Sequence, residues 1–424
     1  MSRKVAIDSL SEEDLKKLSK ELQVAQTPSK YAFTSQPTYI CLYDAEGNDL
    51  YIPFSYAKKY PRPERSQFPQ QHVHFEGTLR ENQIAVKDEA IERLNSHGSV
   101  IISAACGFGK TSMAIYIATK IKLKTLVLCH RVVLINQWRD SIKKFCPTAT
   151  VQVLTPASKM QDVDFYIMNA TNVPKHSRNF YKEMGLVIVD ELHLIMADKL
   201  SHCMRYILPR YVLGLSATPY RTDGLDILID MYFGKYKIIR KLYRKHFVYR
   251  YNTGFKPDVK LNKMGKVDWS SVLESQCSNQ ERNEIIISII KYFPDRVFLV
   301  LCKRVDQANY LVRRLEEEKE DVTSLIGSNQ EFEQSSRILI GTVQKAGVGF
   351  DHPRLNTLIL ASDVEQYFVQ YLGRVFRRED SEPLIFDLVD DYSLLVKHFR
   401  TRNAVYLEHG GIVKDFHKEF LNFS

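Results

Sequence analysis

The chain has 424 residues, 44% of them hydrophobic and 26% charged, and a formal net charge of +9 at pH 7. This length predicts two or three domains, because single cores stop growing near about 250–300 residues. No apolar run approaches the roughly 18–20 residues that span a bilayer, and no apolar stretch follows the basic start, which argues against membrane insertion and secretion. The seven cysteines are dispersed without a C-x-x-C pair, which favours free thiols over disulfides or a zinc site. We therefore expect a soluble intracellular protein of the cytoplasm or nucleus, or of a virion if it is viral.

The positive charge is concentrated in one segment. Between residues 235 and 266 the sequence holds eleven Lys or Arg and one Asp, so this segment carries the whole positive excess. Clustered cations either form a solvated surface or bind the phosphates of a polyanion. Composition leaves both interpretations open.

Residues 1–75 differ from the rest of the chain. The stretch SEED at 11–14 resembles a capping box ahead of a short amphipathic helix. A proline-punctuated stretch, KKYPRPERSQFPQQ at 58–71, indicates a linker or an irregular loop. We treat these residues as an N-terminal extension of unknown role.

From residue 76 onward, short apolar runs alternate with stretches of helical period, which is typical of buried parallel strands joined by helices. The runs before residue 220 are Val100–Ser103, Thr125–Leu128, Phe165–Met168, Leu186–Val189 and Val212–Leu215. The runs after residue 295 are Val297–Leu301, Ile338–Ile340, Thr357–Leu360 and Leu384–Phe386. The two groups predict two α/β domains in tandem, at 76–234 and 273–424, joined by the basic segment at 235–272.

The first of these strands leads into a glycine-rich turn, and a helix is predicted over Ser112–Ile121. A turn in this context can cradle phosphates, because its backbone N–H groups converge on them. Lys110 would place a positive charge near the terminal phosphates, and the Thr111 hydroxyl could bind Mg²⁺. A glycine turn with a coincidental Lys-Thr pair is the alternative. The expected nucleotide-binding residues of the turn are Ala104, Ala105, Cys106, Gly107, Phe108, Gly109, Lys110, Thr111 and Ser112.

Two acidic residues follow the strand predicted at Leu186–Val189. Ligands of parallel sheets bind beyond the carboxyl ends of the strands. Asp190 is therefore placed to hold Mg²⁺, and Glu191 to orient or deprotonate an attacking water. Together with the turn, this pair predicts hydrolysis of ATP or GTP.

These two features belong to a longer series of motifs, in which the chain resembles the superfamily-2 helicases over about residues 76–395. AACGFGKT resembles that family's A-x-x-G-x-G-K-T, where alanine at the first position is ordinary. The other matching motifs of the first half are LRENQ at 79–83, LCHRVVLINQW at 128–138, DELH at 190–193 and LSATPYRTDG at 215–224. Those of the second half are FLVLCKRVDQANYLVRRL at 298–315, ILIGTVQKAGVGFD at 338–351 and QYLGRVFRR at 370–378.

The resemblance implies two tandem RecA-like domains, ATP and Mg²⁺ as cofactors, and further nucleotide contacts by Arg80, Gln83, Gly349 and Asp351, with Gln83 reading adenine. It also implies that Arg374 and Arg377 of the second domain reach the phosphates of ATP, with Gln370 as a polar residue of the same motif. The implied nucleic-acid contacts are His130, Arg131, Thr171, Arg221, Lys303, Arg304 and Thr342. The implied coupling residues are His193, Ser216, Ala217 and Thr218. Two departures are Tyr371, where many relatives have Arg, and Phe350, which replaces an aliphatic residue.

Two stretches narrow the resemblance. SATPYRTDG and SNQERNEIIISII at 278–290 resemble DNA helicases of the xeroderma pigmentosum B and UvsW type and their relatives in large DNA viruses. We therefore expect a nucleic-acid-stimulated ATPase that moves on or remodels DNA, in repair, recombination or transcript release. Two alternatives stay open. One is a helicase of the same type that acts on RNA, and the other is an ATP-switched nucleic-acid-binding factor without unwinding.

The basic segment gains a more specific expectation from this resemblance. Arg240, Lys241, Arg244 and Lys245 are expected to contact phosphates, so their neutralisation should weaken nucleic-acid binding and reduce its salt dependence. Protein partners are not predicted from the sequence.

Overall fold

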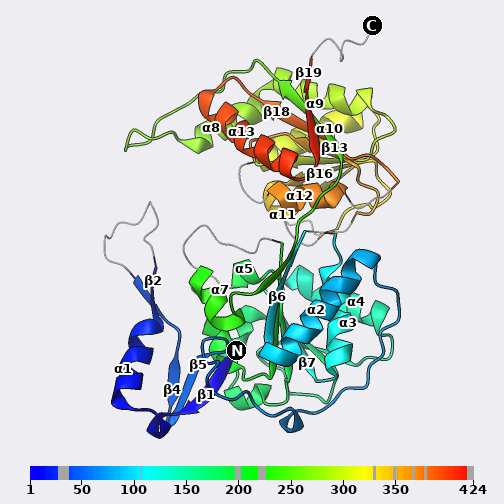
Figure 1. Cartoon of the computed structure of the whole chain (residues 1–424). Helices are drawn as coiled ribbons and strands as arrows, with labels where there is room; N and C mark the ends of the chain where they lie inside the picture. Colours follow the sequence, from blue (N-terminus) through cyan, green and yellow to red (C-terminus); the bar gives the residue numbers. More distant parts are fainter. Residues whose placement is uncertain are drawn as a thin grey trace. The chain divides into compact units, whose positions relative to one another are not determined.

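The computed structural model divides into two compact units, Met1–Arg240 and Lys241–Ser424 (Figure 1). Each unit contains a seven-stranded sheet whose strand pairs are all parallel. The predicted fold class, two tandem α/β domains with parallel sheets, is confirmed. Among the described residues, no helix combines the length and apolar character that crossing a bilayer requires. The structure describes residues 1–26, 38–105, 107–195, 202–217, 226–327, 331–346, 350, 352–364, 368–376 and 380–417.

The first sheet has the strand order β12-β6-β11-β10-β7-β9-β8. Its strands are β6 (Ser99–Ala104), β7 (Thr125–Cys129), β8 (Val151–Leu154), β9 (Phe165–Asn169), β10 (Leu186–Val189), β11 (Tyr211–Ser216) and β12 (Lys237–Arg240). The four strands β6, β7, β10 and β11 are buried throughout, which explains their continuous apolar runs. All five strands predicted in this half are present. The two edge strands β8 and β12 escaped prediction because polar residues interrupt them.

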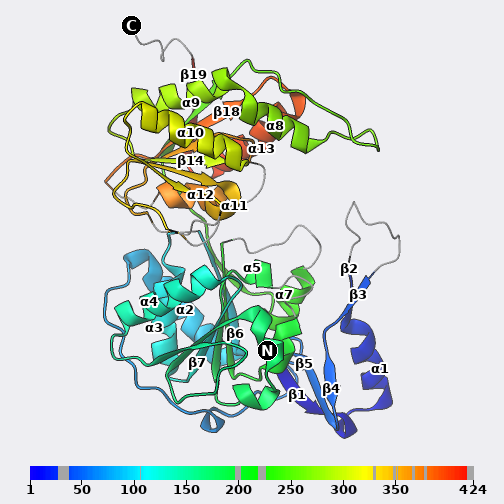
Figure 2. The ribbon, with the colours of Figure 1, turned by 180° about the vertical axis from the view of Figure 1, so that it is seen from behind.

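Helices cover the first sheet on two faces. Figures 1 and 2 show α2 (Glu81–His97), α3 (Lys110–Ile121) and α4 (Val132–Phe145) together on one side, and α7 (Asp226–Phe233) on the other. The short helix α5 (Leu192–Ile195) contacts β11. Because all seven strands are parallel, the segments that follow their carboxyl ends meet at one edge of the sheet. That edge holds the candidate site.

The N-terminal extension belongs to the first compact unit. It forms an antiparallel sheet of β1 (Ser2–Ala6), β5 (Asp49–Pro53) and β4 (Asp44–Glu46), with α1 (Glu12–Glu21) and a ribbon of β2 (Gln23–Gln26) and β3 (Thr38–Cys41). The Ser11 side chain caps α1 by accepting from the Asp14 N–H at 3.1 Å, as its sequence predicts. Backbone bonds join the extension to the rest of the unit, from Ser2 N to Ile207 O at 2.9 Å and from Ser55 N to Met231 O at 3.0 Å.

The second sheet has the strand order β15-β16-β14-β17-β18-β13-β19. Its strands are β13 (His246–Asn252), β14 (Phe298–Cys302), β15 (Val322–Leu325), β16 (Ile338–Thr342), β17 (Thr357–Leu360), β18 (Leu384–Val389) and β19 (Gly411–Phe416). The four strands predicted in this half are present, with the first shifted by one residue. The basic segment supplies β13, whose His246, Val248 and Tyr251 are buried.

Alternate side chains along the second sheet enter two separate cores. Phe298 and Val300 of β14 pack with α9 (Gln280–Tyr292) and α10 (Val305–Glu317). Leu299 and Leu301 pack with α12 (Phe368–Val375) and α13 (Ser393–Glu408) on the other face. This alternation gives three layers, helix on sheet on helix. Two further helices are α8 (Trp269–Ser278) and α11 (Val343–Ala346).

Candidate nucleotide site and nucleic-acid motifs

The glycine-rich turn follows the carboxyl end of β6 and leads into α3. Gly107 and Gly109 have φ of 84° and 86°, in the left-handed region that favours glycine. A Cβ atom on Gly109 would lie 2.3 Å from Gln83 Nε2 and 2.9 Å from Arg80 Nη2. The left-handed φ therefore favours glycine at position 109, and a Cβ there would displace the ends of the Gln83 and Arg80 side chains.

Arg80 and Gln83 brace this turn from the start of α2. Arg80 Nη2 donates to the carbonyl oxygen of Gly107 at 2.8 Å. Gln83 Nε2 donates to those of Phe108 at 2.8 Å and Gly109 at 3.3 Å, while Gln83 Oε1 accepts from the Arg80 N–H at 2.8 Å. The structure thus brings both residues onto the turn, and the reading of adenine by Gln83 stays a prediction.

The remaining residues of the turn lie around the start of α3. Lys110 Nζ donates to the carbonyl oxygens of Ala104 at 2.6 Å and Ala105 at 3.3 Å. Ser112 Oγ donates to Gly109 O at 3.0 Å. Ala104 is buried as the last residue of β6, so alanine fits where other phosphate loops have glycine. Cys106 lies outside the described residues.

Asp190 follows β10 at the same edge of the sheet, and α4 holds it in place. Trp138 Nε1 donates to Asp190 Oδ2 at 2.8 Å, and the Glu191 N–H donates to Asp190 Oδ1 at 3.0 Å. Burial and the Glu191 charge raise the pKa of Asp190 to about 6, against the Trp138 hydrogen bond and the charge of Lys110, which lower it. The motif LCHRVVLINQW includes Trp138, but the sequence alone predicted no role for this residue. Its bond to Asp190 depends on packing, which the spacing of the two residues does not show.

Glu191 has a φ of 47°, which is unusual for a residue with a side chain. Glu191 Oε2 lies 3.6 Å from His193 Nδ1, and that nitrogen shares a hydrogen bond of 2.9 Å with Ser216 Oγ. The predicted coupling residues His193 and Ser216 are therefore in direct contact. Ala217 is described beside Ser216, whereas Thr218 lies outside the described residues.

The donor set at this edge fits ATP with Mg²⁺. Mg²⁺ binds through one or two protein oxygens and keeps waters and substrate phosphates as its other ligands. Asp190 offers a buried carboxylate whose raised pKa shows that its negative charge lacks full compensation. Thr111, in the first turn of α3, offers a hydroxyl. The glycine turn, which leaves little room for a side chain at 109, provides backbone N–H groups for phosphates.

Three predicted nucleic-acid contacts of the first unit follow strands of its sheet. His130 and Arg131 follow β7, and Thr171 follows β9, where Asn169 Oδ1 accepts from the Thr171 N–H at 3.0 Å. Burial lowers the pKa of His130 to about 4, with Arg131 and His193 adding to the shift. His130 is therefore neutral at pH 7, and its ring nitrogens have no hydrogen-bond partner among the described residues. Arg221 lies outside the described residues.

The predicted contacts of the second unit also follow parallel strands. Lys303 and Arg304 follow β14, and Thr342 ends β16 beside it. The Lys303 N–H donates to Ser362 Oγ at 3.1 Å, and Arg304 Nη2 donates to Ser270 Oγ at 2.5 Å. Thr342 is largely buried and Arg304 is partly buried, so the exposed Lys303 is the strongest candidate for a phosphate contact.

The predicted catalytic residues of the second unit lie on α12. Arg374 is buried, donates through Nη1 to Phe350 O at 2.5 Å and has its guanidinium 4.8 Å from the Phe350 ring centroid. Gln370 is also buried. Tyr371, one of the two departures from the family pattern, donates to Val343 O at 2.7 Å and so has a structural contact. Gly349, Asp351 and Arg377 lie outside the described residues. Roles of Gln370, Arg374 and Arg377 at the phosphates stay predictions.

Comparisons with known proteins identify the family of the chain. The family model described as "Type III restriction enzyme, res subunit" matches residues 76–221. The chain is 43% identical to "Putative helicase 161L" of Invertebrate iridescent virus 6, over 98% of this chain and 100% of the relative. It is 33% identical to "Putative helicase 055L" of Frog virus 3, over 87% of each chain. The chain belongs to the superfamily-2 helicases.

A solved helicase structure has a similar fold. S. cerevisiae Dbp5 bound to RNA and ADP BeF3 superposes with a TM-score of 0.54, over 80% of this chain and 93% of that one, at 14% identity. At this identity the likeness shows the fold alone. A relative in Acanthamoeba polyphaga mimivirus, 28% identical over 94% of this chain and 82% of its own, carries the name of an ATP-dependent RNA helicase. Membership in the family implies use of ATP and binding of nucleic acid.

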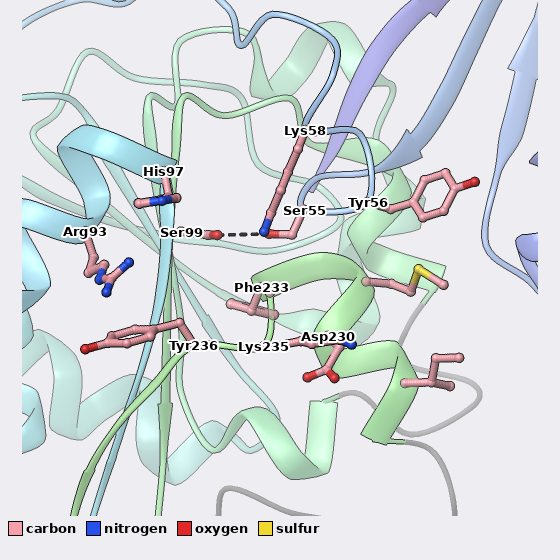
Figure 3. A pocket seen from close by; sticks show the side chains of 13 residues that line it. Ser55, Tyr56, Lys58, Arg93, His97, Ser99, Asp230, Phe233, Lys235 and Tyr236 are labelled. Carbon is pink, nitrogen blue, oxygen red and sulfur yellow. Dashed lines mark hydrogen bonds between the residues drawn. The ribbon is translucent and has the colours of Figure 1, made fainter.

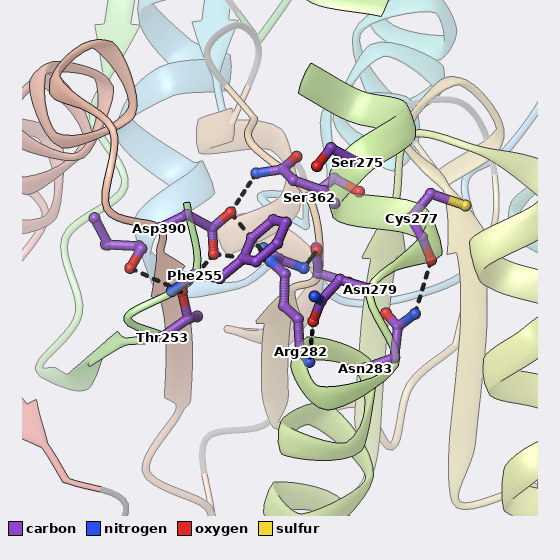
Figure 4. Close-up of polar contacts among 12 residues, drawn as sticks. Thr253, Phe255, Ser275, Cys277, Asn279, Arg282, Asn283, Ser362 and Asp390 are labelled. Carbon is purple, nitrogen blue, oxygen red and sulfur yellow. Dashed lines mark hydrogen bonds and ion pairs between the residues drawn. The ribbon is translucent and has the colours of Figure 1, made fainter. Parts of the chain in front are cut away.

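A buried polar network lies among the segments that follow β14, β17 and β18 in the second unit (Figure 4). Arg282 of the motif SNQERNEIIISII donates through Nε to both carboxylate oxygens of Asp390, at 2.8 and 3.1 Å, and both side chains are fully buried. Its neighbour Asn283 accepts from Gln307 Nε2 at 2.9 Å, and Gln307 Oε1 accepts from Ser362 Oγ at 2.7 Å. The same Ser362 Oγ accepts from the Lys303 N–H. The Arg-Asn pair therefore holds the segments after β14, β17 and β18 together.

A separate pocket of about 840 Å³ lies at the other end of β6 from the glycine turn (Figure 3). Its lining comes from the extension, α2, α7 and the segment after α7, and Ser55 Oγ is bonded to Ser99 Oγ at 2.9 Å within it. Arg93 stacks over the Tyr236 ring with its guanidinium 3.7 Å from the centroid. The pocket therefore lies where the extension packs against α2 and α7 of the same unit.

The basic segment is partly used within the protein. Arg240 pairs with Glu89 at 3.5 Å, and Lys241 with Glu408 at 2.6 Å. Arg244 donates to the carbonyl oxygens of Phe376 and Ser381, each at 2.6 Å. Three of the four cations expected to contact phosphates thus have protein partners, which the sequence could not show.

Proposed function

We propose that this helicase hydrolyses ATP with Mg²⁺ and uses the energy to move on, or remodel, DNA. The observation that carries the proposal is the arrangement at the edge of the first sheet. There the glycine turn follows β6, Lys110 begins α3 and Asp190 follows β10, and the charge of Lys110 lowers the pKa of Asp190. A lysine this close to a buried carboxylate matches a nucleotide site with a metal.

Different residues of the chain are proposed to carry out the separate steps of ATP hydrolysis. When bound, ATP supplies the phosphoryl group that is cleaved, and Mg²⁺ neutralises part of its charge. Backbone N–H groups at Gly107 and Gly109 and the ammonium of Lys110 bind phosphate oxygens. Asp190 and Thr111 hold the metal, directly or through water, and Glu191 accepts a proton from the attacking water.

His193 and Ser216 are proposed to pass changes at Glu191 to the nucleic-acid side. Glu191 contacts His193, and His193 is bonded to Ser216. A change in the Glu191 carboxylate therefore alters the hydrogen bond at the end of β11. This short chain of contacts can bias the segment that follows Ser216.

DNA is favoured over RNA as the substrate by two stretches. SATPYRTDG and the Arg-Asn motif resemble DNA helicases, and Asn283 of that motif is connected through a chain of hydrogen bonds to the backbone N–H of Lys303. RNA is the second candidate, because the mimivirus relative carries an RNA helicase name. Contacts to the sugar-phosphate backbone suit either polymer.

The decisive experiment measures ATP turnover with duplex DNA, single-stranded DNA and RNA in parallel, followed by strand displacement on the same polymers. We expect the largest stimulation and the displacement with DNA. Lys110→Ala is the negative control, because it removes the phosphate charge. Equal stimulation by RNA would shift the proposal to the second candidate, and turnover without displacement would indicate a switch rather than a motor.

A further inference from the structure

The second half of the basic segment forms a projecting hairpin, residues 260–268, just before α8 (Figure 1). We call it the basic hairpin. Leu261 and Val267 form a β-bridge, and Asp268 N donates to Lys260 O at 2.8 Å. Asn262 Oδ1 accepts from the N–H groups of Met264 at 2.9 Å and Lys266 at 3.1 Å. These bonds define the turn that carries the tip.

The tip of the basic hairpin is apolar and exposed. Leu261 is 64% exposed and Met264 is 68% exposed. Single apolar residues on a surface are ordinary, but two on one fixed turn form a small apolar wedge. Burial of this wedge against a partner would be favourable without a further cost of ordering the turn.

Three lysines flank the tip. Lys260, Lys263 and Lys266 are exposed, and the described part of the chain offers none of them an acidic partner within salt-bridge distance. Lys241 and Lys256, in contrast, pair with Glu408 and Asp391. An apolar tip ringed by free ammonium groups complements a polyanion with apolar faces, which describes nucleic acid rather than an apolar protein groove.

The base of the basic hairpin is tied to a predicted nucleic-acid contact. Arg304 Nη2 donates to Ser270 O at 3.3 Å and to Ser270 Oγ at 2.5 Å, two residues beyond the hairpin. The Lys260 N–H donates to Ser271 Oγ at 2.9 Å. The Trp269 ring stacks on His398 with 5.2 Å between centroids. A strand bound at Arg304 would therefore pass the root of the hairpin.

We infer that the basic hairpin is a wedge for the junction between double-stranded and single-stranded nucleic acid. Leu261 and Met264 pack against the last base pair, and the three lysines bind phosphates beside it. Apolar side chains inserted at base steps unstack them in other nucleic-acid-binding proteins. This inference rests on the proposed function, because only a motor drives a junction onto a wedge.

The test separates the wedge from the motor. Forked DNA, forked RNA and the matching single strands are used with the full chain and with two hairpin variants. The tip variant is Leu261→Ser with Met264→Ser, and the charge variant replaces Lys260, Lys263 and Lys266 by Gln. Their controls are Leu407→Ser, an exposed leucine of the same unit, and Gln at Lys16, Lys17 and Lys20, exposed lysines of α1.

We expect the tip variant to keep the ATP turnover stimulated by single strands and to lose strand displacement about tenfold. The charge variant should bind forks less tightly and lower the slope of log K against log salt by about two to three. Both controls should match the wild type.

Displacement at the wild-type rate by the tip variant overturns the inference, and so does an equal loss in the controls. A wild-type chain with neither ATP turnover nor displacement overturns the proposed function and, with it, the wedge. An active wild type with an active tip variant overturns the wedge alone.

Discussion

The indole N–H of Trp138 donates to the carboxylate of Asp190 at 2.8 Å, which connects α4 to the acidic end of β10. Both side chains are buried, so the bond is made where water cannot replace it. A hydrogen bond to a buried carboxylate favours its charged form. In the proposed function, Trp138 is therefore a positioning residue that favours the ionised form of Asp190.

Trp138→Phe should move the acid limb of ATP turnover to higher pH. Without the indole bond the pKa of Asp190 rises above about 6, so the carboxyl stays protonated, and unable to bind Mg²⁺, further toward neutral pH. Loss of a hydrogen bond to a charged group predicts a shift of about one to two pH units. The measurement is ATP turnover against pH at Mg²⁺ concentrations below saturation, because saturating Mg²⁺ would compete with protonation of Asp190. Tyr166→Phe, which removes another buried donor of the same sheet, is the control, and an unmoved limb in Trp138→Phe contradicts the role.

Glu191→Gln should bind ATP and turn it over about 10²- to 10⁴-fold more slowly, because it removes the proton acceptor. Glu191→Gly should be as slow but more stable, by about 1 kcal/mol, since glycine relieves the left-handed φ of 47°. Single-turnover kinetics and thermal unfolding measure the two effects. Turnover near the wild-type rate in either variant would remove Glu191 from the proposed chemistry.

Ser216→Ala should uncouple hydrolysis from movement. It removes the hydroxyl bonded to His193 at 2.9 Å but leaves the glycine turn and Asp190 in place. We expect basal ATP turnover to persist and displacement to fall about tenfold, a typical coupling energy between two sites. Ser55→Ala, which breaks the buried Ser55–Ser99 bond at the other end of β6, is the matched control. Equal losses in both variants would point to a general effect on the first unit.

The sequence predicted the interior of both sheets well, because their strands are buried on two faces and read as apolar runs. Strands with polar positions, such as β12 (KIIR) and β1 (SRKVA), carry no such run and were missed. The glycine turn and the acid pair were found because each is contiguous in sequence. Trp138, 52 residues before Asp190, was not given its role, since only the packing of α4 brings it there.

For the basic segment, a count of charges did not predict which cations pair with acidic residues of the protein. Its excess was visible in the composition, but the residue that each cation faces is a tertiary property. Lys241 faces Glu408, 167 residues away, whereas Lys263 lies in a local turn and has no such partner among the described residues. The sequence therefore located the segment but not the lysines within it that are free to bind phosphates.

Arg282→Leu should destabilise the second unit by about 3–5 kcal/mol, because it leaves the buried Asp390 carboxylate without its cation. The Lys303 segment is held by the same network, so nucleic-acid binding should weaken as well. Hydrogen exchange of the β14 amides reports this unit alone. Arg314→Gln, which breaks partly exposed pairs on α10, is the control and should change little. Unchanged β14 exchange in Arg282→Leu would contradict the structural role of the motif.

Gly109→Ala should weaken ATP binding, because the new Cβ would displace the Gln83 and Arg80 side chains that brace the turn. Gly109 and Gly47 both have a positive φ, 86° and 60°, so alanine strains the backbone at either position. Only at Gly109 would the new Cβ meet other side chains, Gln83 Nε2 at 2.3 Å and Arg80 Nη2 at 2.9 Å, whereas nothing lies within 4 Å at Gly47. Strain alone costs about 1 kcal/mol of stability. Calorimetric titration with ATP should therefore show a lower affinity for Gly109→Ala than for Gly47→Ala, and equal affinities in the two variants would contradict the role of the braced turn in ATP binding.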